Sequence, residues 1–381
     1  MKIVIAPQSF KGSLAAWEVA ESIERGIRRV VPRADILVLP MADGGEGTVD
    51  ALVFSTGGRF MKCEVTGPLG DKVEANWGIL GDGATAVLEM AAASGLILLA
   101  PEKRNPLVTT TYGTGEMVRA VLDAGCRRII IGIGGSATND GGAGMAQALG
   151  AQLTDRDGRE LAPGGAALAR LNHIDVSGMD SRLKECRITI ASDVTNTLCG
   201  AEGASWVYGP QKGATEDMCR QLDKALENYA AVIRKDLGID IMDMPGAGAA
   251  GGLGAGLAVF LGAELVPGID IVSEAVGLAE HLKGATLVFT GEGRLDSQTM
   301  FGKAVAGVTA RAKEAGVPVV ALTGGIEGNM SDLYEQGISS VLCIAPGPIS
   351  VEESQEKASQ LITDTAERAM RLIMINPVNQ P

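Results

Sequence analysis

The chain has 381 residues, of which 46% are hydrophobic and only 3% aromatic, and its formal net charge is −13. This length suits two domains with aliphatic cores. The acidic balance excludes general nucleic-acid binding, which needs a basic patch, and no apolar run reaches the ~18 residues of a membrane span.

The first elements predict a parallel sheet. Residues 2–7 have the pattern of a buried strand, and a helix is expected from Ser13, its N-cap, to Pro32. Residues 36–40 form a second apolar run, which the loop 41–47 follows. A strand, a helix and a strand in this order make a βαβ unit.

The pattern then changes to short strands separated by turns, which predicts antiparallel hairpins and the entry into a second domain. These strands are expected at 63–66, 73–79 and 85–89. The later elements of this domain are a helix at 114–124, strands at 129–133 and 187–191, a helix at 218–235 and a glycine-alanine segment at 246–256.

The simpler pattern returns near the C-terminus. Strands are expected at 287–290, 318–323 and 340–345, and a last helix at 351–373. The fold class is therefore α/β with two α/β domains. A parallel-sheet domain (1–65 plus 285–381) is interrupted by an inserted mixed α/β domain (66–284).

Four loops after strands combine a carboxylate with a small hydroxyl or amide, and three of them also contain glycine. They are residues 43–48, 134–142, 192–196 and 291–297. Phosphoryl transfer needs such groups, because carboxylates hold Mg²⁺ and accept the proton of the attacking hydroxyl, while backbone N–H groups bind phosphates. The loop 134–142, which follows an apolar run ending in glycine, indicates an anion site.

Three lysines stand in glycine- or serine-rich loops, namely Lys11, Lys212 and Lys303. A lysine in a tight loop is not explained by a solvated helix face, so contact with phosphate or carboxylate is a reasonable hypothesis for each.

Other chemistries fit less well. Residues 246–251 match the dinucleotide fingerprint G-x-G-x-x-G, but the preceding residues 240–245 carry charges and a proline where a buried strand should be. A close-packed helix start is the better interpretation. The Walker pattern is absent, and the two histidines, His173 and His281, have no metal-ligand spacing.

The six cysteines contain no CxxC pair, and the N-terminal residues show no signal-peptide pattern. A cytoplasmic location with reduced cysteines is expected.

Taken together, residues 5–14, 42–48, 132–142, 193–196, 209–213, 246–254 and 291–297 resemble the bacterial glycerate kinases of the type-1 family over nearly the whole chain. The resemblance implies a flavodoxin-like domain and a second α/β domain, with the active site in the cleft between them. It implies ATP and Mg²⁺ as cofactors and D-glycerate as the small-molecule substrate. The enterobacterial-type members make 2-phosphoglycerate in glucarate, galactarate, glyoxylate or allantoin breakdown.

The chain departs from the family pattern at three places. Gln8 stands where the family usually has aspartate. The glutamine keeps an acceptor oxygen but lacks the negative charge. Thr197 and Ala304-Val305 replace residues that are often proline, and these are tolerable loop changes.

Asp193 is the candidate general base, because it follows a buried strand and stands beside Asn196; Asp296 is the alternative. Lys11 and Arg294 are expected to meet the glycerate carboxylate or the transferred phosphoryl group, which makes them catalytic candidates with Asp193. The candidates divide by role into Ser9, Lys11, Asp43, Asn139, Asp193 and Arg294 for the substrate, Gly134, Gly135, Ser136, Asn139, Lys212, Gly248, Gly251, Glu292 and Lys303 for the nucleotide, and Asp140 and Asp296 for the metal.

Two other classes of function stay open. The glycine fingerprint suggests an NAD-dependent oxidoreductase of a small hydroxy acid, and Gln8 suggests a non-catalytic ligand-binding sensor. The residues do not decide between phosphorylation at C2 and at C3, because both hydroxyls suit the same side chains. They also leave open a monomer or a homodimer.

Overall fold

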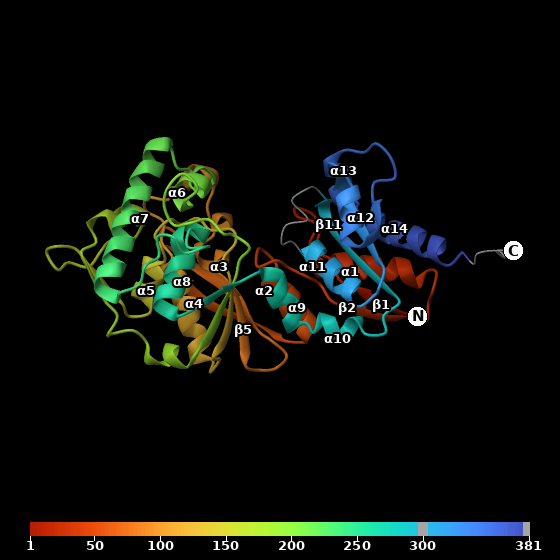
Figure 1. Ribbon diagram of the computed structural model, residues 1–381, viewed down its shortest axis with the longest axis horizontal. Helices are drawn as coiled ribbons and strands as arrows, with labels where there is room; N and C mark the ends of the chain where they lie inside the picture. The colour runs from red at the N-terminus through yellow and green to blue at the C-terminus, as the bar shows by residue number, and fades with distance from the viewer. Residues whose placement is uncertain (296–303, 376–381) are drawn as a thin grey trace. The chain divides into compact units, whose positions relative to one another are not determined.

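The computed structural model describes residues 1–295 and 304–375, which form two compact units (Figure 1). Unit 1 comprises Met1–Asp43, Asp50–Gly57 and Ile269–Pro381, and unit 2 comprises Gly44–Val49 and Gly58–Gly268. The sequence interpretation put the joins at 65/66 and 284/285; where independently folding domains begin and end stays a prediction.

Unit 1 is built on a five-stranded sheet in the order β13-β12-β11-β1-β2, and every neighbouring pair is parallel. Numbered along the unit and read from β2, this is the order 2-1-3-4-5 of flavodoxin-like sheets. The strands are β1 (Lys2–Ile5), β2 (Asp35–Val38), β11 (Leu287–Leu295), β12 (Val319–Ile326) and β13 (Ile338–Cys343). The predicted α/β class with a parallel sheet is confirmed.

Helices cover both faces of this sheet. One core contains buried residues of β1, α1 and α14, and a second contains Leu295, Val305 and Leu333 from β11, α11 and α12. The helices are α1 (Ala16–Arg28), α2 (Thr48–Thr56), α9 (Gly268–Ala275), α10 (Leu278–Leu282), α11 (Ala304–Glu314), α12 (Ser331–Gln336), α13 (Val351–Glu356) and α14 (Ala358–Ile373).

Two local predictions for unit 1 are wrong. The last helix is interrupted at Lys357, whose φ of −97° and ψ of 6° separate α13 from α14. Ser13 does not cap α1: the Ala15 N–H donates to the Glu18 carboxylate at 2.8 Å. The Ser13 hydroxyl instead donates to the carbonyl oxygen of Gln355 at 2.8 Å, which ties the loop after β1 to α13.

Unit 2 contains a six-stranded sheet in the order β10-β9-β6-β5-β4-β3. The first three strands form antiparallel hairpins, as predicted, and β5, β6, β9 and β10 are parallel. Its strands are β3 (Arg59–Thr66), β4 (Lys72–Ile79), β5 (Thr85–Glu89), β6 (Arg128–Gly132), β9 (Arg187–Ala191) and β10 (Glu264–Val266), beside the small pair β7 (Gln152–Thr154) and β8 (His173–Asp175).

The unit 2 sheet packs against a mainly aliphatic core that also contains the buried aromatic side chains Trp77, Tyr229 and Phe260. The α-helices are α3 (Ala91–Ser94), α4 (Tyr112–Asp123), α5 (Ala143–Ala148), α6 (Ala204–Tyr208), α7 (Glu216–Leu237) and α8 (Leu253–Leu261). The 3₁₀ helices are η1 (Leu96–Leu98), η2 (Pro101–Lys103), η3 (Gly165–Arg170), η4 (Ser181–Glu185), η5 (Pro210–Lys212) and η6 (Ala249–Gly252).

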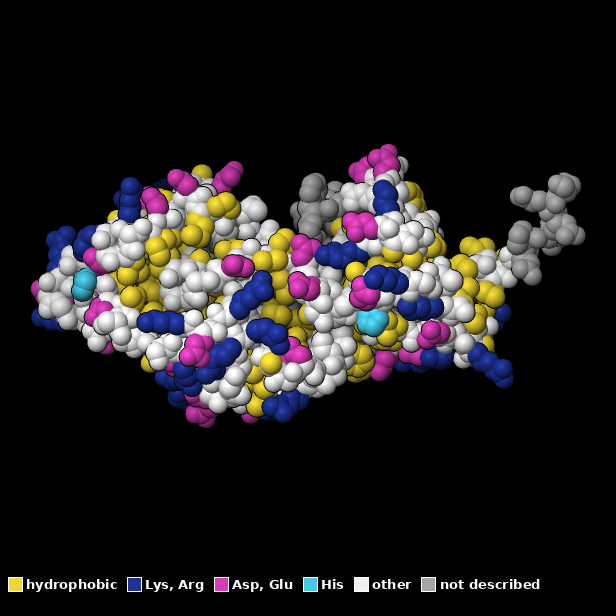
Figure 2. Space-filling model, turned by 60° about the horizontal axis from the view of Figure 1, so that its bottom comes forward, with side chains coloured by type: hydrophobic (Ala, Val, Ile, Leu, Met, Phe, Trp, Pro, Cys, Tyr) yellow, Lys and Arg dark blue, Asp and Glu magenta, His cyan; other side chains and the backbone are white. Residues whose placement is uncertain are grey.

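On the face that Figure 2 shows, acidic and basic side chains are interspersed rather than separated by sign. Across residues 1–295 and 304–375, no helix combines the length and apolar character that crossing a bilayer would require.

Glycines before and within α8 allow two backbone segments of unit 2 to touch. Gly251 has a φ of +72°, and a Cβ there would lie 2.0 Å from the carbonyl oxygen of Thr138. A Cβ on Gly256 would lie 2.4 Å from the carbonyl oxygen of Gly141. The glycine-alanine segment is therefore required for close packing against the loop after β6.

Replacing Gly251 with alanine should lower the free energy of unfolding by about 2–5 kcal/mol, because a steric clash adds to the cost of a positive φ. Gly262→Ala is the matched control, since its φ is +62° and nothing lies within 4 Å of its Cβ. Urea unfolding measures both variants. Equal destabilisation of the two would show that the contact with Thr138 does not matter.

Candidate functional site

Unit 1 contains a pocket at the carboxyl edge of its sheet, with a volume of about 500 Å³. It is lined by residues that follow β1, β2 and β13, by the last residues of β11 and β12, and by residues of α13 and the start of α14. The strand order reverses between β1 and β11, and ligands of open α/β sheets bind at such switch points. The topology of unit 1 therefore makes this pocket its principal candidate site.

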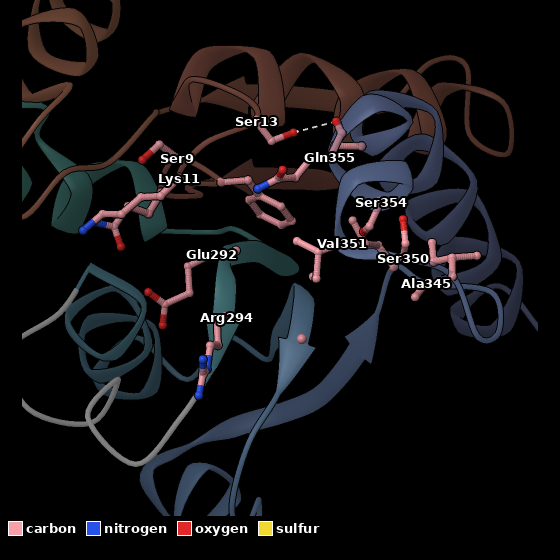
Figure 3. Close-up of a pocket in the computed structure, with 18 of the residues that line it drawn as sticks. Ser9, Lys11, Ser13, Glu292, Arg294, Ala345, Ser350, Val351, Ser354 and Gln355 are labelled. Carbon is pink, nitrogen blue, oxygen red and sulfur yellow. Dashed lines mark hydrogen bonds between the residues drawn. The ribbon is translucent and has the colours of Figure 1, made fainter. Parts of the chain in front are cut away.

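One wall of the pocket carries most of its charged groups. Glu292 and Arg294 stand two residues apart on β11, so both side chains leave the same face of the strand. Lys11 comes from the loop after β1, and Figure 3 shows Lys11, Glu292 and Arg294 extending toward the same side. The Glu292 side chain is 7% exposed, whereas Lys11 is exposed and Arg294 forms an ion pair with Glu327. We call Lys11, Asp43, Glu292 and Arg294 the charged wall.

Gln8 is hydrogen-bonded to a carboxylate of the charged wall. Its Nε2 donates to Asp43 Oδ2 at 2.8 Å, its backbone N–H donates to the Gly291 carbonyl, and its side chain is buried. An aspartate at position 8 would replace this N–H donor with a second carboxylate beside Asp43, and the two like charges would repel each other. The glutamine at this position thus gives the Asp43 carboxylate an uncharged hydrogen-bond donor. Ser9, the next predicted substrate residue, also lines the pocket.

The opposite side of the pocket is largely apolar and comes from the C-terminal part of the chain. We call Phe10, Ile344, Ile349, Val351 and Ala358 the apolar wall, with Ser354 and Gln355 as its polar rim. In Figure 3, Val351 and Ser354 lie away from Lys11 and Glu292. The sequence analysis missed this wall, although the rule that sites follow strands would have pointed to Ile344 and Ala345 after β13.

The glycine-rich loop after β6 is built differently from the open anion site that the sequence suggested. Residues 136–142 are buried, and only Gly134 and Gly135 of the predicted nucleotide residues there are exposed. Its N–H groups are used internally: Ala137 donates to the Ser94 carbonyl, and Gly141 donates to the Gly251 carbonyl. Nucleotide contact stays a prediction for this loop, and Gly134 and Gly135 are its accessible part.

Asp140 anchors this loop from within unit 2. Its Oδ2 accepts from the Thr111 N–H at 2.8 Å, the Thr111 hydroxyl at 2.9 Å and the Gly144 N–H, and its Oδ1 accepts from the Gly142 N–H. Burial raises the pKa of this carboxyl, and the four hydrogen bonds oppose that shift. The arrangement gives Asp140 a structural role, while its predicted role as a metal ligand stays a prediction.

Lys212 lies beneath the same loop. Its side chain is 1% exposed, and its Nζ donates to the carbonyl oxygen of Thr138 at 2.7 Å. Burial lowers the pKa of Lys212 to about 7, although the nearby Asp140 acts in the opposite direction. A lysine so placed stabilises the loop backbone from inside, and direct contact with a phosphate would require the loop to open.

The depressed pKa of Lys212 predicts a pH-dependent stability. Between about pH 7 and 10 the unfolded chain binds a proton that folded Lys212 has lost, so the free energy of unfolding should rise with pH. Lys212→Met should abolish that rise. Urea unfolding at pH 7 and pH 9 measures the slope, with Lys224→Met, on the exposed side of α7, as the control. Equal slopes for the wild type and Lys212→Met would contradict the assignment.

Two neighbouring loop residues also face inward. Asn139 is fully buried, its Nδ2 donates to the Ser205 hydroxyl at 3.0 Å, and no donor among the described residues reaches its Oδ1. The Ser136 hydroxyl donates to the Ala250 carbonyl at 3.2 Å. Their predicted ligand contacts stay predictions.

The dinucleotide fingerprint is explained by packing. Residues 239–245 form no strand, and the Gly248 N–H donates to the Asn196 carbonyl. A Cβ on Gly248 would lie 2.2 Å from the Thr197 carbonyl, as one on Gly251 would meet Thr138. Both glycines therefore have a structural reason to be there, and their contact with a nucleotide stays a prediction.

Asp193 follows β9 in unit 2, as the sequence analysis expected, and its side chain is exposed. Its Oδ1 accepts from the Gly268 N–H at 3.2 Å. The Asn196 side chain donates to the Glu202 carbonyl and accepts from the Tyr208 hydroxyl. Two further candidates from the sequence analysis, Asp296 and Lys303, lie outside the described residues.

The carboxylates of the charged wall suit magnesium. Mg²⁺ at phosphate sites takes one or two carboxylates together with substrate phosphates and water, and Asp43 and Glu292 supply such oxygens. Within residues 1–295 and 304–375, no cluster of three or more His, Cys, Asp or Glu side chains could hold a metal by itself. A metal in this pocket would therefore be held jointly with the substrates.

Comparison with known proteins agrees with this geometry. A family model described as "Glycerate kinase family" matches residues 3–374. The chain is 54% identical to "Glycerate kinase" of Bacillus subtilis (96% of each chain) and 54% identical to "Glycerate 2-kinase" of Escherichia coli (93% of each chain). A crystal structure described as "putative glycerate kinase 2 from Salmonella typhimurium LT2" superimposes with a TM-score of 0.90 at 51% identity and 98% coverage of both chains. The oxidoreductase alternative finds no support in these comparisons.

Proposed function

The chain belongs to the glycerate kinase family, and we propose that it transfers the γ-phosphoryl group of ATP to the C2 hydroxyl of D-glycerate, giving 2-phosphoglycerate. The observation that carries this proposal from the structure is the unit 1 pocket, which brings two cations and two carboxylates to the switch point of a flavodoxin-like sheet. An acid substrate and a polyphosphate need the cations, and the Mg²⁺ that accompanies the polyphosphate needs carboxylate ligands.

The charged wall offers a specific division of work. Arg294 presents a planar guanidinium that can hold the glycerate carboxylate through two hydrogen bonds, while Lys11 is a point charge suited to a phosphoryl oxygen. Asp43, which accepts a hydrogen bond from Gln8, and Glu292 would hold Mg²⁺, which would neutralise charge on the transferred group.

Asp193 is the proposed general base. An exposed carboxylate at the carboxyl end of β9 can accept the proton of the attacking hydroxyl, and its Gly268 N–H contact fixes one oxygen. We further propose that the enzyme is located in the cytoplasm, where ATP is supplied. It would act as a monomer or a homodimer.

A coupled assay tests the reaction. The protein is mixed with D-glycerate, ATP and Mg²⁺ in the presence of enolase, pyruvate kinase and lactate dehydrogenase, and the loss of NADH is followed. Signal without phosphoglycerate mutase means that 2-phosphoglycerate is formed, and signal only with the mutase means 3-phosphoglycerate. A silent wild type with an active Gln8→Asp variant would show that Gln8 disables the kinase, and silence of both would overturn the proposal.

A further inference from the structure

The unit 1 pocket is larger than glycerate requires. Its volume of about 500 Å³ is in the range that encloses drug-sized ligands. Glycerate is a three-carbon acid, and its carboxylate and hydroxyls find suitable partners on the charged wall. Glycerate has no apolar group that would contact the apolar wall, which includes Phe10 and Ile344. This wall is therefore available to a second ligand or to an apolar part of one.

The apolar wall has the character of a surface for a flat, weakly polar ring. Phe10, Ile344 and Ala358 are at most 4% exposed and form its floor, while Val351 stands at its open edge and is 68% exposed. The polar rim adds directional groups: the Ser354 hydroxyl and the Gln355 side-chain amide can each donate and accept a hydrogen bond. Such a surface matches the faces and edges of a nucleobase.

We propose that the apolar wall holds the adenine base of ATP, so that unit 1 binds the phosphoryl donor with its base on this wall and its phosphates toward Lys11. The inference rests on the proposed function. It is supported by the charge of the opposite wall, which suits a polyphosphate, and by the switch point between β1 and β11, where flavodoxin-like sheets bind nucleotides. The inward-facing loop after β6 in unit 2 leaves few groups for the same task.

The bond between the Ser13 hydroxyl and the Gln355 carbonyl is part of this proposal. It joins the loop that carries Lys11 to the helix that carries the polar rim, at 2.8 Å (Figure 3). One fixed assembly can therefore contact the base and the phosphates of a single nucleotide.

Ser354→Trp tests the inference, because an indole at the polar rim would occupy the apolar wall. We expect the KM for ATP to rise by at least about tenfold, a loss of ~1.4 kcal/mol of binding. The KM for D-glycerate at saturating ATP should stay within about twofold. Val351→Trp is a second variant at an exposed position, and Glu356→Trp, at the end of α13 and outside the pocket lining, is the matched control.

Equilibrium dialysis of ADP, without glycerate, provides the second readout. Ser354→Trp and Val351→Trp should each bind ADP at least about tenfold more weakly than the wild type and Glu356→Trp. Unchanged ADP binding, or a rise in the KM for glycerate instead of ATP, would overturn the inference. A wild type that binds ADP but phosphorylates no glycerate would contradict the proposed function alone.

Discussion

We expect Asp193→Asn to lower the kcat of glycerate phosphorylation by about 10²–10⁴-fold, the contribution that a general base makes to proton transfer. The substitution keeps an acceptor oxygen for the Gly268 N–H, so the loop after β9 should stay in place. It removes only the group that can take a proton at neutral pH. The KM values for both substrates should change by less than about threefold, because the base acts in the transition state rather than in binding.

The pH profile separates this role from a structural one. Loss of a base should remove the acidic limb of the kcat profile, whereas a loosened loop would lower kcat at every pH. Asp240→Asn, an exposed position of unit 2 that pairs with Arg234, is the control and should keep wild-type turnover. Near wild-type turnover of Asp193→Asn would exclude Asp193 as the base, and Asp296→Asn, at the alternative candidate, would then be tested in the same way.

The strands and their pairing could be predicted where the order of apolar and polar side chains is specific to one kind of strand. The run Ile129-Ile130-Ile131 is buried in β6 between parallel neighbours, as a continuous β-branched run in a central strand should be. The alternation of short strands and turns between 63 and 89 gave the hairpins β3-β4-β5 for the same reason.

Glycine content could not distinguish an anion site from close packing. Both need a backbone without a Cβ, and the sequence alone does not show whether the N–H groups of residues 134–142 face a ligand or the protein. The structure shows that several of them bond to unit 2 itself, as at Gly141 and Gly142. The same ambiguity applies to Lys212, which is inside the protein although its loop composition resembles an exposed phosphate contact.

The apolar wall escaped prediction because its members are far apart in sequence. Phe10 follows β1, whereas Ile344 follows β13 and Val351 begins α13, so these side chains line one pocket only when β1 and β13 enter one sheet. A local pattern cannot carry that information. The break at Lys357 adds to the difficulty, since the helical periodicity of residues 351–373 gives no sign of it.

The second large effect is expected at Arg294. Arg294→Met should reduce kcat/KM for D-glycerate by about 10²-fold or more, because a charge-assisted pair of hydrogen bonds to the substrate carboxylate is lost. Most of the loss should be in the KM for glycerate, and the KM for ATP should change less. Arg294→Lys should recover part of the affinity, because it restores the charge but not the planar fork.

Glu327→Gln is the control that separates substrate binding by Arg294 from a structural role of its ion pair. Glu327 is the ion-pair partner of Arg294, and both side chains are more than half exposed. Such exposed pairs contribute only ~0–1 kcal/mol, so loss of the pair should leave kcat/KM within about fivefold of the wild type. If Glu327→Gln impairs the enzyme as strongly as Arg294→Met, then the ion pair orders the end of β11, and the guanidinium does not bind the substrate. A large loss at Arg294 alone assigns the guanidinium to the acid.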